Sequence, residues 1–126
     1  MSFITSDSFI AMVKVSLKEK ITIDDFSASG GDRLDLDFKA TKRYNVHITL
    51  TEIAAKDRPE LAPDGQIGIW ITMVDTKTGV TTNTMMYTPL PNTSIMQVHA
   101  ADLIAHSVYF AIGTTRNKVY TSTKAY

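Results

Sequence analysis

The side chains capable of acid–base or nucleophilic chemistry are few and scattered along this sequence. Neither His47 nor the Asp24-Asp25 pair has partners at a spacing that indicates a catalytic triad. Ser107 follows His106 within an expected helix and lacks the strand-to-helix turn of a nucleophile elbow. The chain has no cysteine, which excludes thiolate chemistry and disulfides. We therefore expect no enzyme and no catalytic residue.

Metal and cofactor signals are also missing from the sequence. His99 and His106 share one face of an expected helix, but they are not at the i, i+4 spacing of a helical metal pair, and no carboxylate cluster accompanies them. The Ser-Gly-Gly at 29–31 lacks the lysine and the spacing of a phosphate-binding loop. We expect no metal and no cofactor, and we interpret the two histidines as polar positions on a helix.

Alternation of apolar and polar residues is the strongest pattern in the chain. A period of two is typical of strands with one buried and one solvated face. Segment 33–39 shows it most clearly, and segments 43–53 and 66–75 repeat it. The polar side of the last two segments carries Asn45, His47, Thr49, Thr51, Trp70 and Thr72. These side chains are expected to share one solvated sheet face.

The remaining elements complete an α+β order. Segments 8–17 and 20–26 are expected as an N-terminal hairpin, followed by strands over 33–39, 43–53, 66–75 and 80–90. Pro89 and Pro91 cannot donate ladder hydrogen bonds and end the last strand. A helix is predicted over 95–112, with Gly113 at its C′ position. The sequence thus predicts one domain, with an antiparallel meander over 1–91 and a helical segment over 92–126.

The length and the charge of the chain limit the classes of protein to which it can belong. The 126 residues correspond to one domain, and 13 basic residues balance 13 acidic ones, so bulk charge indicates no generic polyanion binder. The N-terminus lacks a signal-peptide pattern, and no uncharged apolar run is long enough to span a membrane. We expect a cytosolic chain with no membrane partner.

The expected arrangement leaves too much apolar surface for one copy. Six strands about 4.8 Å apart form a sheet roughly 25 Å wide, whereas one helix is only about 10–12 Å across. The helix is also apolar around much of its circumference. We therefore expect an obligate homodimer, with Ile95, Val98, Leu103, Ile104 and Val108 at its interface. The alternative is a monomer whose N-terminal hairpin folds over the helix.

Three segments resemble the coat proteins of small single-stranded RNA bacteriophages, the leviviruses. They are RYNVHITLT (43–51), NTMMYTPLPNTS (83–94) and the terminal KAY (124–126). The resemblance implies an interlocked dimer that assembles into an icosahedral shell around an RNA genome, in a virion built in the bacterial cytoplasm. The sequence departs from the family in a longer loop over 54–65 and a shorter turn over 75–79.

The resemblance also implies that the solvated sheet face binds RNA, including a hairpin whose capture represses translation. Unpaired bases stack on aromatic rings and form hydrogen bonds to hydroxyls and amides, and phosphates need cations. The implied RNA-binding residues are Asn45, His47, Thr49, Thr51, Trp70, Thr72, Asn83, Tyr87 and, for phosphate, Arg43. Asp35 and Asp37 share this face and would repel RNA unless they are peripheral or paired.

Two other functions remain open on the sequence alone. In a small α+β pocket protein, His47, Trp70 and Tyr87 would line a ligand cavity. A tail or head-completion protein of a DNA phage would form rings rather than shells. Trp70 has a simpler interpretation as well, in which it only packs against a neighbour on the sheet.

Overall fold

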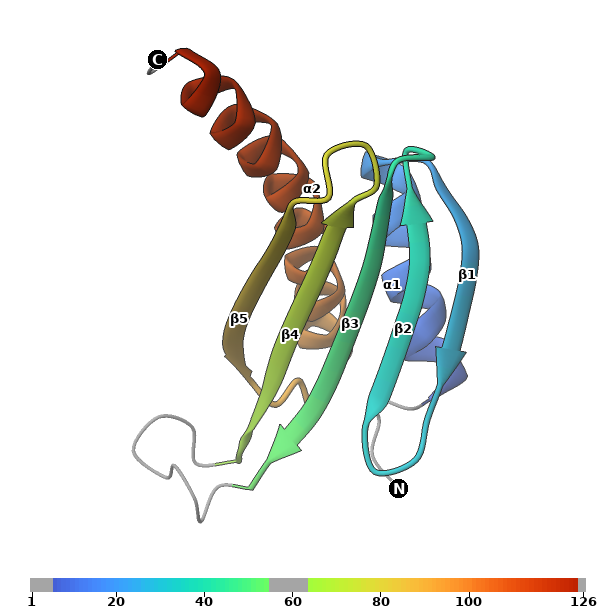
Figure 1. The fold of residues 1–126 in the computed structure, drawn as a ribbon. Coiled ribbons are helices and arrows are strands. Elements are labelled where there is room, and N and C mark those ends of the chain that lie inside the picture. The colour runs from blue at the N-terminus through green and yellow to red at the C-terminus, as the bar shows by residue number, and fades with distance from the viewer. Residues whose placement is uncertain (1–5, 55–63, 125–126) are drawn as a thin grey trace.

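Over the residues that the structure describes, the chain folds as one antiparallel sheet with two helices. The computed structural model describes residues 6–54 and 64–124, the last of these (115–124) by their backbone alone. Figure 1 shows the seven elements in chain order. They are α1 (Asp7–Lys20), β1 (Ile23–Ser29), β2 (Leu34–Ala40), β3 (Tyr44–Ile53), β4 (Gln66–Asp75), β5 (Thr81–Pro89) and α2 (Ser94–Lys124). The predicted α+β class is confirmed.

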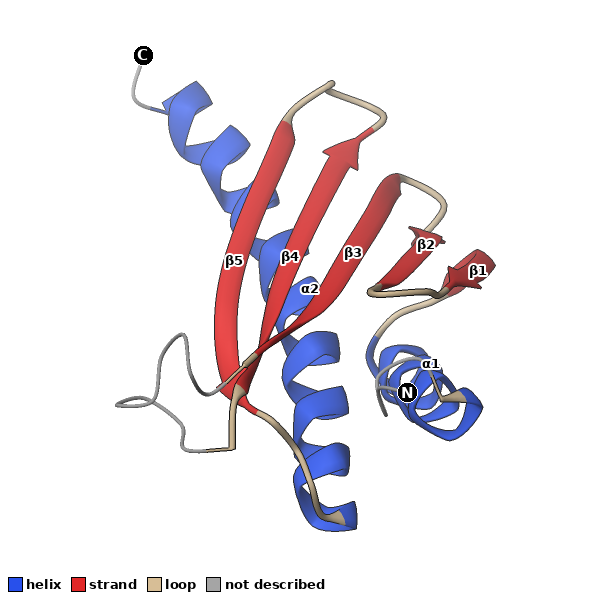
Figure 2. Cartoon of the chain, turned by 90° about the horizontal axis from the view of Figure 1, so that it is seen from below, coloured by secondary structure: helices blue, strands red, loops and turns tan. Residues whose placement is uncertain are grey.

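The sheet is a simple meander in the order β1-β2-β3-β4-β5, with every neighbouring pair antiparallel. Both helices lie on the same face of the sheet, and no helix of the described residues lies on the opposite face (Figures 1 and 2). We call the helix-covered face the inner face and the other the outer face. The predicted strands over 33–39, 43–53, 66–75 and 80–90 are confirmed as β2 to β5, with ends shifted by a residue or so.

The predicted N-terminal hairpin is wrong, because residues 8–17 belong to helix α1. Ser6 caps this helix by accepting a hydrogen bond from the backbone N–H of Phe9 (3.2 Å). Phe9, Val13 and Leu17 recur every four residues and are completely buried. The imperfect alternation of this segment is therefore one stripe of a helix. Residues 1–91 consequently contain a helix as well as strands, and β1 begins only after α1, at Ile23.

The predicted end of the last helix is also wrong. Gly113 lies within α2, which continues to Lys124. A glycine inside a helix costs only about 1 kcal/mol relative to alanine, and so it does not by itself stop one. The stretch Ser94–Thr114 is long and apolar enough to span a membrane by length and composition, but almost half of it is buried within the fold. We interpret it as a core helix.

The two helices together cover the inner face. Five strands span about 20 Å, which two helices about 10 Å across match. The inner-face residues of the three central strands are almost fully buried, including Leu36, Ile48 and Ile69 at 0% exposure. Ser16 of α1 donates a hydrogen bond to Asp102 of α2 (3.0 Å), which fixes the pairing of the helices. One copy therefore covers its own sheet, and the excess of inner surface expected from the sequence is absent.

The expected dimer-interface residues are divided by this packing. Ile104 and Val108 are fully buried in the subunit's own core, so a partner cannot reach them. Leu103 is half-buried against that core. Ile95 and Val98 are exposed, at 72% and 48%. Only these last two of the five remain fully available to another chain.

Candidate nucleic-acid interface

The strand register gathers the predicted polar residues on the outer face. His47 lies opposite Thr72, Thr49 opposite Trp70, and Thr72 opposite Asn83. Because directly opposed residues point to the same side of a sheet, the structure brings together Asn45, His47, Thr49, Thr51, Trp70, Thr72, Asn83 and Tyr87. The division of β3, β4 and β5 into two faces, as expected from alternation, is confirmed.

One half of this face, over β4 and β5, is uncharged and aromatic. Trp70, Tyr87 and Met85 are 38%, 43% and 54% exposed. The rings of Trp70 and Tyr87 meet edge to face, with centroids 6.4 Å apart and planes at 75°. The Tyr87 hydroxyl points along β5 toward the sulfur of Met85 (3.7 Å). We call Trp70, Met85 and Tyr87 the aromatic sector.

Beside the aromatic sector lies a hydroxyl–amide pair. Thr72 Oγ1 donates a hydrogen bond to Asn83 Oδ1 (3.0 Å). This contact fixes the orientation of the amide and leaves its NH₂ group able to donate to a ligand. Such a group forms hydrogen bonds to the edge of an unpaired base.

The other half of the outer face, over β2 and β3, is a charged network. His47 Nδ1 lies 2.8 Å from Asp37 Oδ1, and His47 Nε2 lies 3.4 Å from Asp35 Oδ1. Asp35 also accepts hydrogen bonds from Thr49 (2.9 Å) and Arg33 (3.1 Å). Burial opposes the charge of Asp35, but these two donors hold the pKa of its carboxyl below the ordinary value. Asp35 and Asp37 therefore both have hydrogen-bonding partners, which is one of the two possibilities that the sequence left open.

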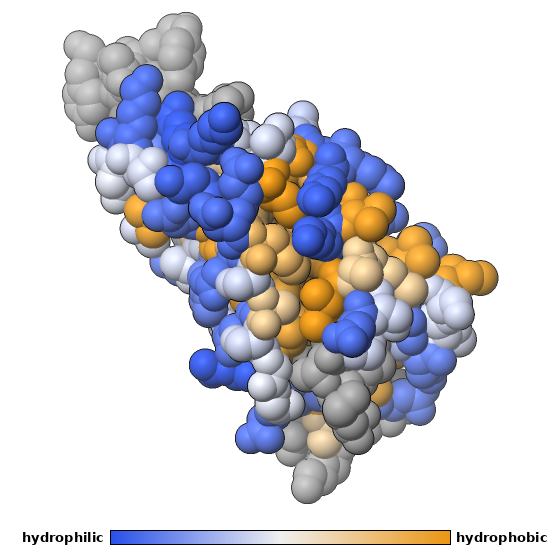
Figure 3. Space-filling model, turned by 90° about the vertical axis from the view of Figure 1, so that its right-hand side faces the viewer, coloured by the Kyte–Doolittle hydropathy of each residue, from blue (hydrophilic) through white to orange (hydrophobic). Residues whose placement is uncertain are grey.

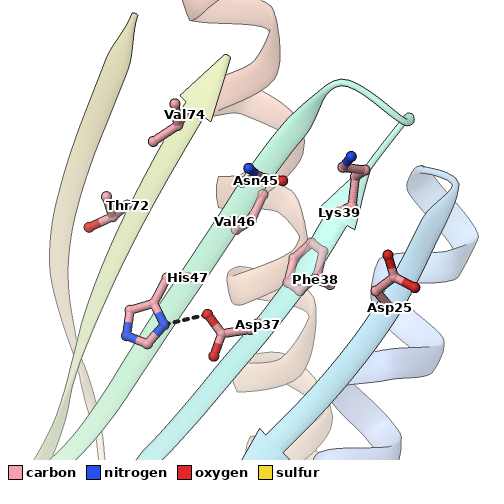
Figure 4. A pocket seen from close by; sticks show the side chains of 9 residues that line it. All are labelled: Asp25, Asp37, Phe38, Lys39, Asn45, Val46, His47, Thr72 and Val74. Atoms are coloured by element: carbon pink, nitrogen blue, oxygen red, sulfur yellow. Dashed lines mark hydrogen bonds and ion pairs between the residues drawn. The ribbon is translucent and has the colours of Figure 1, made fainter. Parts of the chain in front are cut away.

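A shallow hollow of about 340 Å³ opens beside this network. Figure 4 shows His47 and Asp37 hydrogen-bonded at one end, with Lys39 and Asp25 toward β1 and Thr72 on β4. The hollow contains two carboxylates and one ammonium group, together with the Asn45 amide and the edge of Phe38. Its charge does not favour a phosphate, whereas its mixture of donors and acceptors suits a neutral polar group.

Arg43 does not belong to this surface. Its guanidinium donates two hydrogen bonds to Asp75, from Nε to Oδ1 (2.8 Å) and from Nη2 to Oδ2 (2.7 Å). The Asp75 side chain is 1% exposed. These bonds from Arg43 hold the pKa of the Asp75 carboxyl well below its usual range. The predicted phosphate contact at Arg43 is thus replaced by a structural ion pair.

The two edges of the sheet differ in how they are protected. On β1, the register shifts between Asp24 and Ser27, and Asp25 has a positive φ of 57°. Bulges and charges of this kind prevent an edge from pairing with another strand. Figure 3 shows the side of the molecule with this edge, where apolar atoms gather in a patch among polar ones. Phe26 of β1 is covered there by the ammonium group of Lys14, 5.2 Å from its ring centroid.

Among the described residues, neither a bulge nor a charge protects the β5 edge. Thr81–Pro89 contains no charged residue, and its pairing with β4 runs without a register shift. Helix α2 passes behind this strand and projects beyond it (Figure 1). Between α2 and β5 lies a hollow of about 470 Å³, bordered by Met86, Ser107 and Phe110. On the exposed side of α2 beside it, His106 stacks on Phe110 at 6.5 Å between centroids, and Phe110 is 66% exposed.

The remaining sequence candidates have ordinary positions. His99 and His106 are exposed on α2, as their interpretation requires. Ser107 donates its hydroxyl to the carbonyl of Leu103 (2.7 Å), a contact within the helix. Among the described residues, no group of three or more His, Asp or Glu side chains is arranged to hold a metal ion. Most of the long loop over 54–65 lies outside the described residues.

Sequence reasoning gave Gly68 no role. It faces outward between Trp70 on its own strand and Tyr87, its partner in β5. The signal in the sequence was a glycine two positions before the tryptophan in an otherwise regular strand, because such a glycine often marks a close approach by another group.

Comparisons of the chain with protein-family models, with curated proteins and with solved structures find no match.

Proposed function

We propose that this chain is a coat subunit similar to those of small single-stranded RNA bacteriophages, in which two copies pair and the outer sheet face binds RNA. The observation that carries the proposal is the joint position of two features. An exposed, uncharged aromatic face lies directly beside a sheet edge that no bulge or charge of the described residues protects, and a helix projects past that edge. Ordinary monomers avoid free regular edges.

Pairing of two β5 strands accounts for the features of this edge. Two antiparallel β5 strands would extend the two sheets into one, and each α2 would then reach over its partner. The exposed Tyr109 (54%) and Phe110 (66%) lie on that helix, and they replace Ile104 and Val108 as expected interface residues. Ile95 and Val98 remain candidates at the start of α2.

The chemistry of the outer face favours bases over phosphates. Stacking of one base on an aromatic ring contributes about 1–3 kcal/mol and tolerates any base. Trp70 and Tyr87 supply the rings, and Asn83 with Thr72 supplies the hydrogen-bonding groups. Across the two-fold axis of a β5–β5 pair, the aromatic sectors of both copies would adjoin. RNA would then lie along the centre of the joined sheet, away from Asp35 and Asp37.

The pocket-protein alternative has less support. It requires His47, Trp70 and Tyr87 to line a cavity, but all three lie on the face without helices and are open to solvent. The inner face, where an internal cavity would be expected, is filled by α1 and α2. A ring-forming component of a DNA phage remains as an outcome that the experiment below distinguishes.

The test is expression of the whole chain in bacteria, with particle imaging and measurement of mass in solution. We expect uniform closed shells that contain host RNA, and dimers as the smallest species on disassembly. Phe110→Glu should leave folded monomers, whereas Val15→Glu, at a 56% exposed site on α1, should still give dimers. A stable wild-type monomer at high concentration would refute the proposal, and rings without RNA would favour the DNA-phage alternative.

Recognition of a specific hairpin is a separate part of the proposal. The coat subunit should repress a reporter whose start codon lies in the cognate hairpin, and selection of tight-binding RNAs by the purified dimer would identify that hairpin. Failure to enrich any sequence would limit the outer face to general packaging of the genome in the virion.

A further inference from the structure

The space above Gly68 is occupied by two aromatic rings. A Cβ atom built on Gly68 would lie 2.9 Å from Cζ3 and 3.0 Å from Cη2 of Trp70, and 3.4 Å from Cε1 of Tyr87. Real Cβ atoms essentially never approach a neighbour to less than 3.0 Å. The benzo edge of the indole therefore lies where any other side chain at position 68 would be.

The strand geometry explains this contact. Residues 68 and 70 are two apart on β4 and point to the same face, and Gly68 lies opposite Tyr87. Without a side chain at 68, the indole leans along its own strand until it meets the Tyr87 ring edge to face. In this position Trp70 is 38% exposed, so part of the indole surface is open to solvent.

The backbone gives no other reason for a glycine here. Gly65 and Gly79 have positive φ values, 99° and 78°, which favour glycine. Gly68 has no positive φ and lies within the unbroken β4 pairings on both sides. A glycine in the interior of a strand weakens it. The indole that leans over Gly68 is the feature of the structure that accounts for a glycine at this position.

We propose that Gly68 positions Trp70, and that the exposed part of the indole is a stacking platform for an unpaired base of single-stranded RNA, with little preference among bases. This inference rests on the proposed function and assigns the ligand class to one side chain. Gly68 itself touches no ligand and acts through the indole. The platform belongs to the outer face only, and formation of the β5–β5 pair does not require it.

The test is a double-mutant cycle of Gly68→Ala and Trp70→Ala, with short oligo(U) and oligo(A) as probes. We expect G68A to weaken binding of both by roughly 5-fold or more, up to the loss caused by W70A, which is the range of one stack. In the W70A background, G68A should change nothing further. Trp70 is the only tryptophan, so its fluorescence and near-UV circular dichroism report ring position without RNA, and G68A should alter both.

Each outcome of the cycle is decisive. An RNA affinity of G68A equal to that of the wild type would overturn the inference. An equal loss of affinity from G68A with and without Trp70 would also overturn it, because that result would mean that RNA approaches the backbone at Gly68. If G68A does not fold, the double variant G68A/W70F takes its place in the measurement. Phenylalanine lacks the outer ring of the indole, so the contact with a side chain at position 68 is relieved. The affinity of this double variant is compared with that of W70F. Shells that package RNA while G68A binds normally would refute only this inference, whereas wild-type shells without RNA would refute the proposed function.

Discussion

Arg43 and Asp75 form a two-point salt bridge between the start of β3 and the end of β4, with N–O distances of 2.8 and 2.7 Å. Asp75 also accepts a hydrogen bond from the backbone N–H of Lys77 (2.9 Å), and its side chain is almost wholly buried. Parallel N–H···O bonds of this kind are strong and fix geometry. The pair therefore connects the β2–β3 turn to the β4–β5 turn.

Removal of this arginine should destabilise the fold in a pH-dependent way. The pKa of Asp75 is lower in the folded chain than the ordinary value near 3.9, so its stabilising contribution is complete above about pH 4 and is lost as the pH falls below it. Arg43→Met leaves a buried carboxylate without its partner. Urea unfolding should show a clear loss of stability at pH 7 that narrows below about pH 4.

Arg33→Met is the matched control for this prediction. Arg33 pairs with Asp35 through one contact, and its side chain is 62% exposed. Exposed pairs contribute little, and so this variant should unfold almost as the wild type does at both pH values. Equal losses in the two variants would contradict the structural role of Arg43.

Helix α1 should be an integral part of the core. Phe9 is fully buried under the sheet, and Phe9→Ala should cost about 3–5 kcal/mol of unfolding free energy. Val15 lies on the same helix but is 56% exposed, and Val15→Ala should stay within about 0.5 kcal/mol of the wild type. Denaturant titrations of both variants make the measurement, and a small loss for Phe9→Ala would mean that α1 is not docked.

Two substitutions in the turn between β2 and β3 should increase the stability of the fold. Thr41 and Lys42 have φ values of 52° and 59°, and Arg43 N–H bonds to Ala40 O (3.1 Å). Two positive φ values are typical of a type I′ turn, which favours Asn-Gly. Thr41→Asn with Lys42→Gly should therefore stabilise the fold by about 1 kcal/mol in denaturant titrations. Lys77→Gly, in the turn between β4 and β5 and without a positive φ, should give no such gain.

Different mutations should weaken RNA binding and the pairing of two subunits. Tyr87→Ala and Trp70→Ala should each weaken RNA binding by about 1–3 kcal/mol while leaving the dimer intact. Asn83→Ala should weaken binding of a selected hairpin more than that of oligo(U), because an amide reads base edges. Tyr109→Ala, on α2, should weaken pairing of subunits but not the affinity of the remaining dimers. Filter binding and sedimentation measure the two properties, and identical patterns in both assays would contradict this division.

The affinity for single strands should depend only weakly on salt. Arg33 and Arg43 lie just before strands and are paired with Asp35 and Asp75, so Lys39 is the one cation within the described strands, and it faces outward. With two copies per RNA, the slope of log K against log salt should be no steeper than about −1.5. A slope several times steeper would show that other cations dominate and that stacking is secondary.

The sequence by itself determined the four strands β2 to β5 and which residues of the regular strands share a face. Alternation in segments such as 43–53 and 66–75 is local, because successive side chains of a strand point to opposite sides. That rule was sufficient to place His47, Thr49, Trp70 and Thr72 on polar strand faces before any fold was known, whereas Asn83 and Tyr87 were added by the resemblance.

Only the tertiary structure decided what covers the sheet and which charges are free. The segment 8–17 fits a strand or a helix almost equally, and burial of Phe9, Val13 and Leu17 against the sheet selects the helix. Arg43 has a surface sequence context, yet a buried carboxylate 32 residues away binds it. Contacts between segments distant in the chain have no local signature, so the choice of α1 as a second cover, the burial of Ile104 and Val108, and the indole over Gly68 became evident only once the chain was folded.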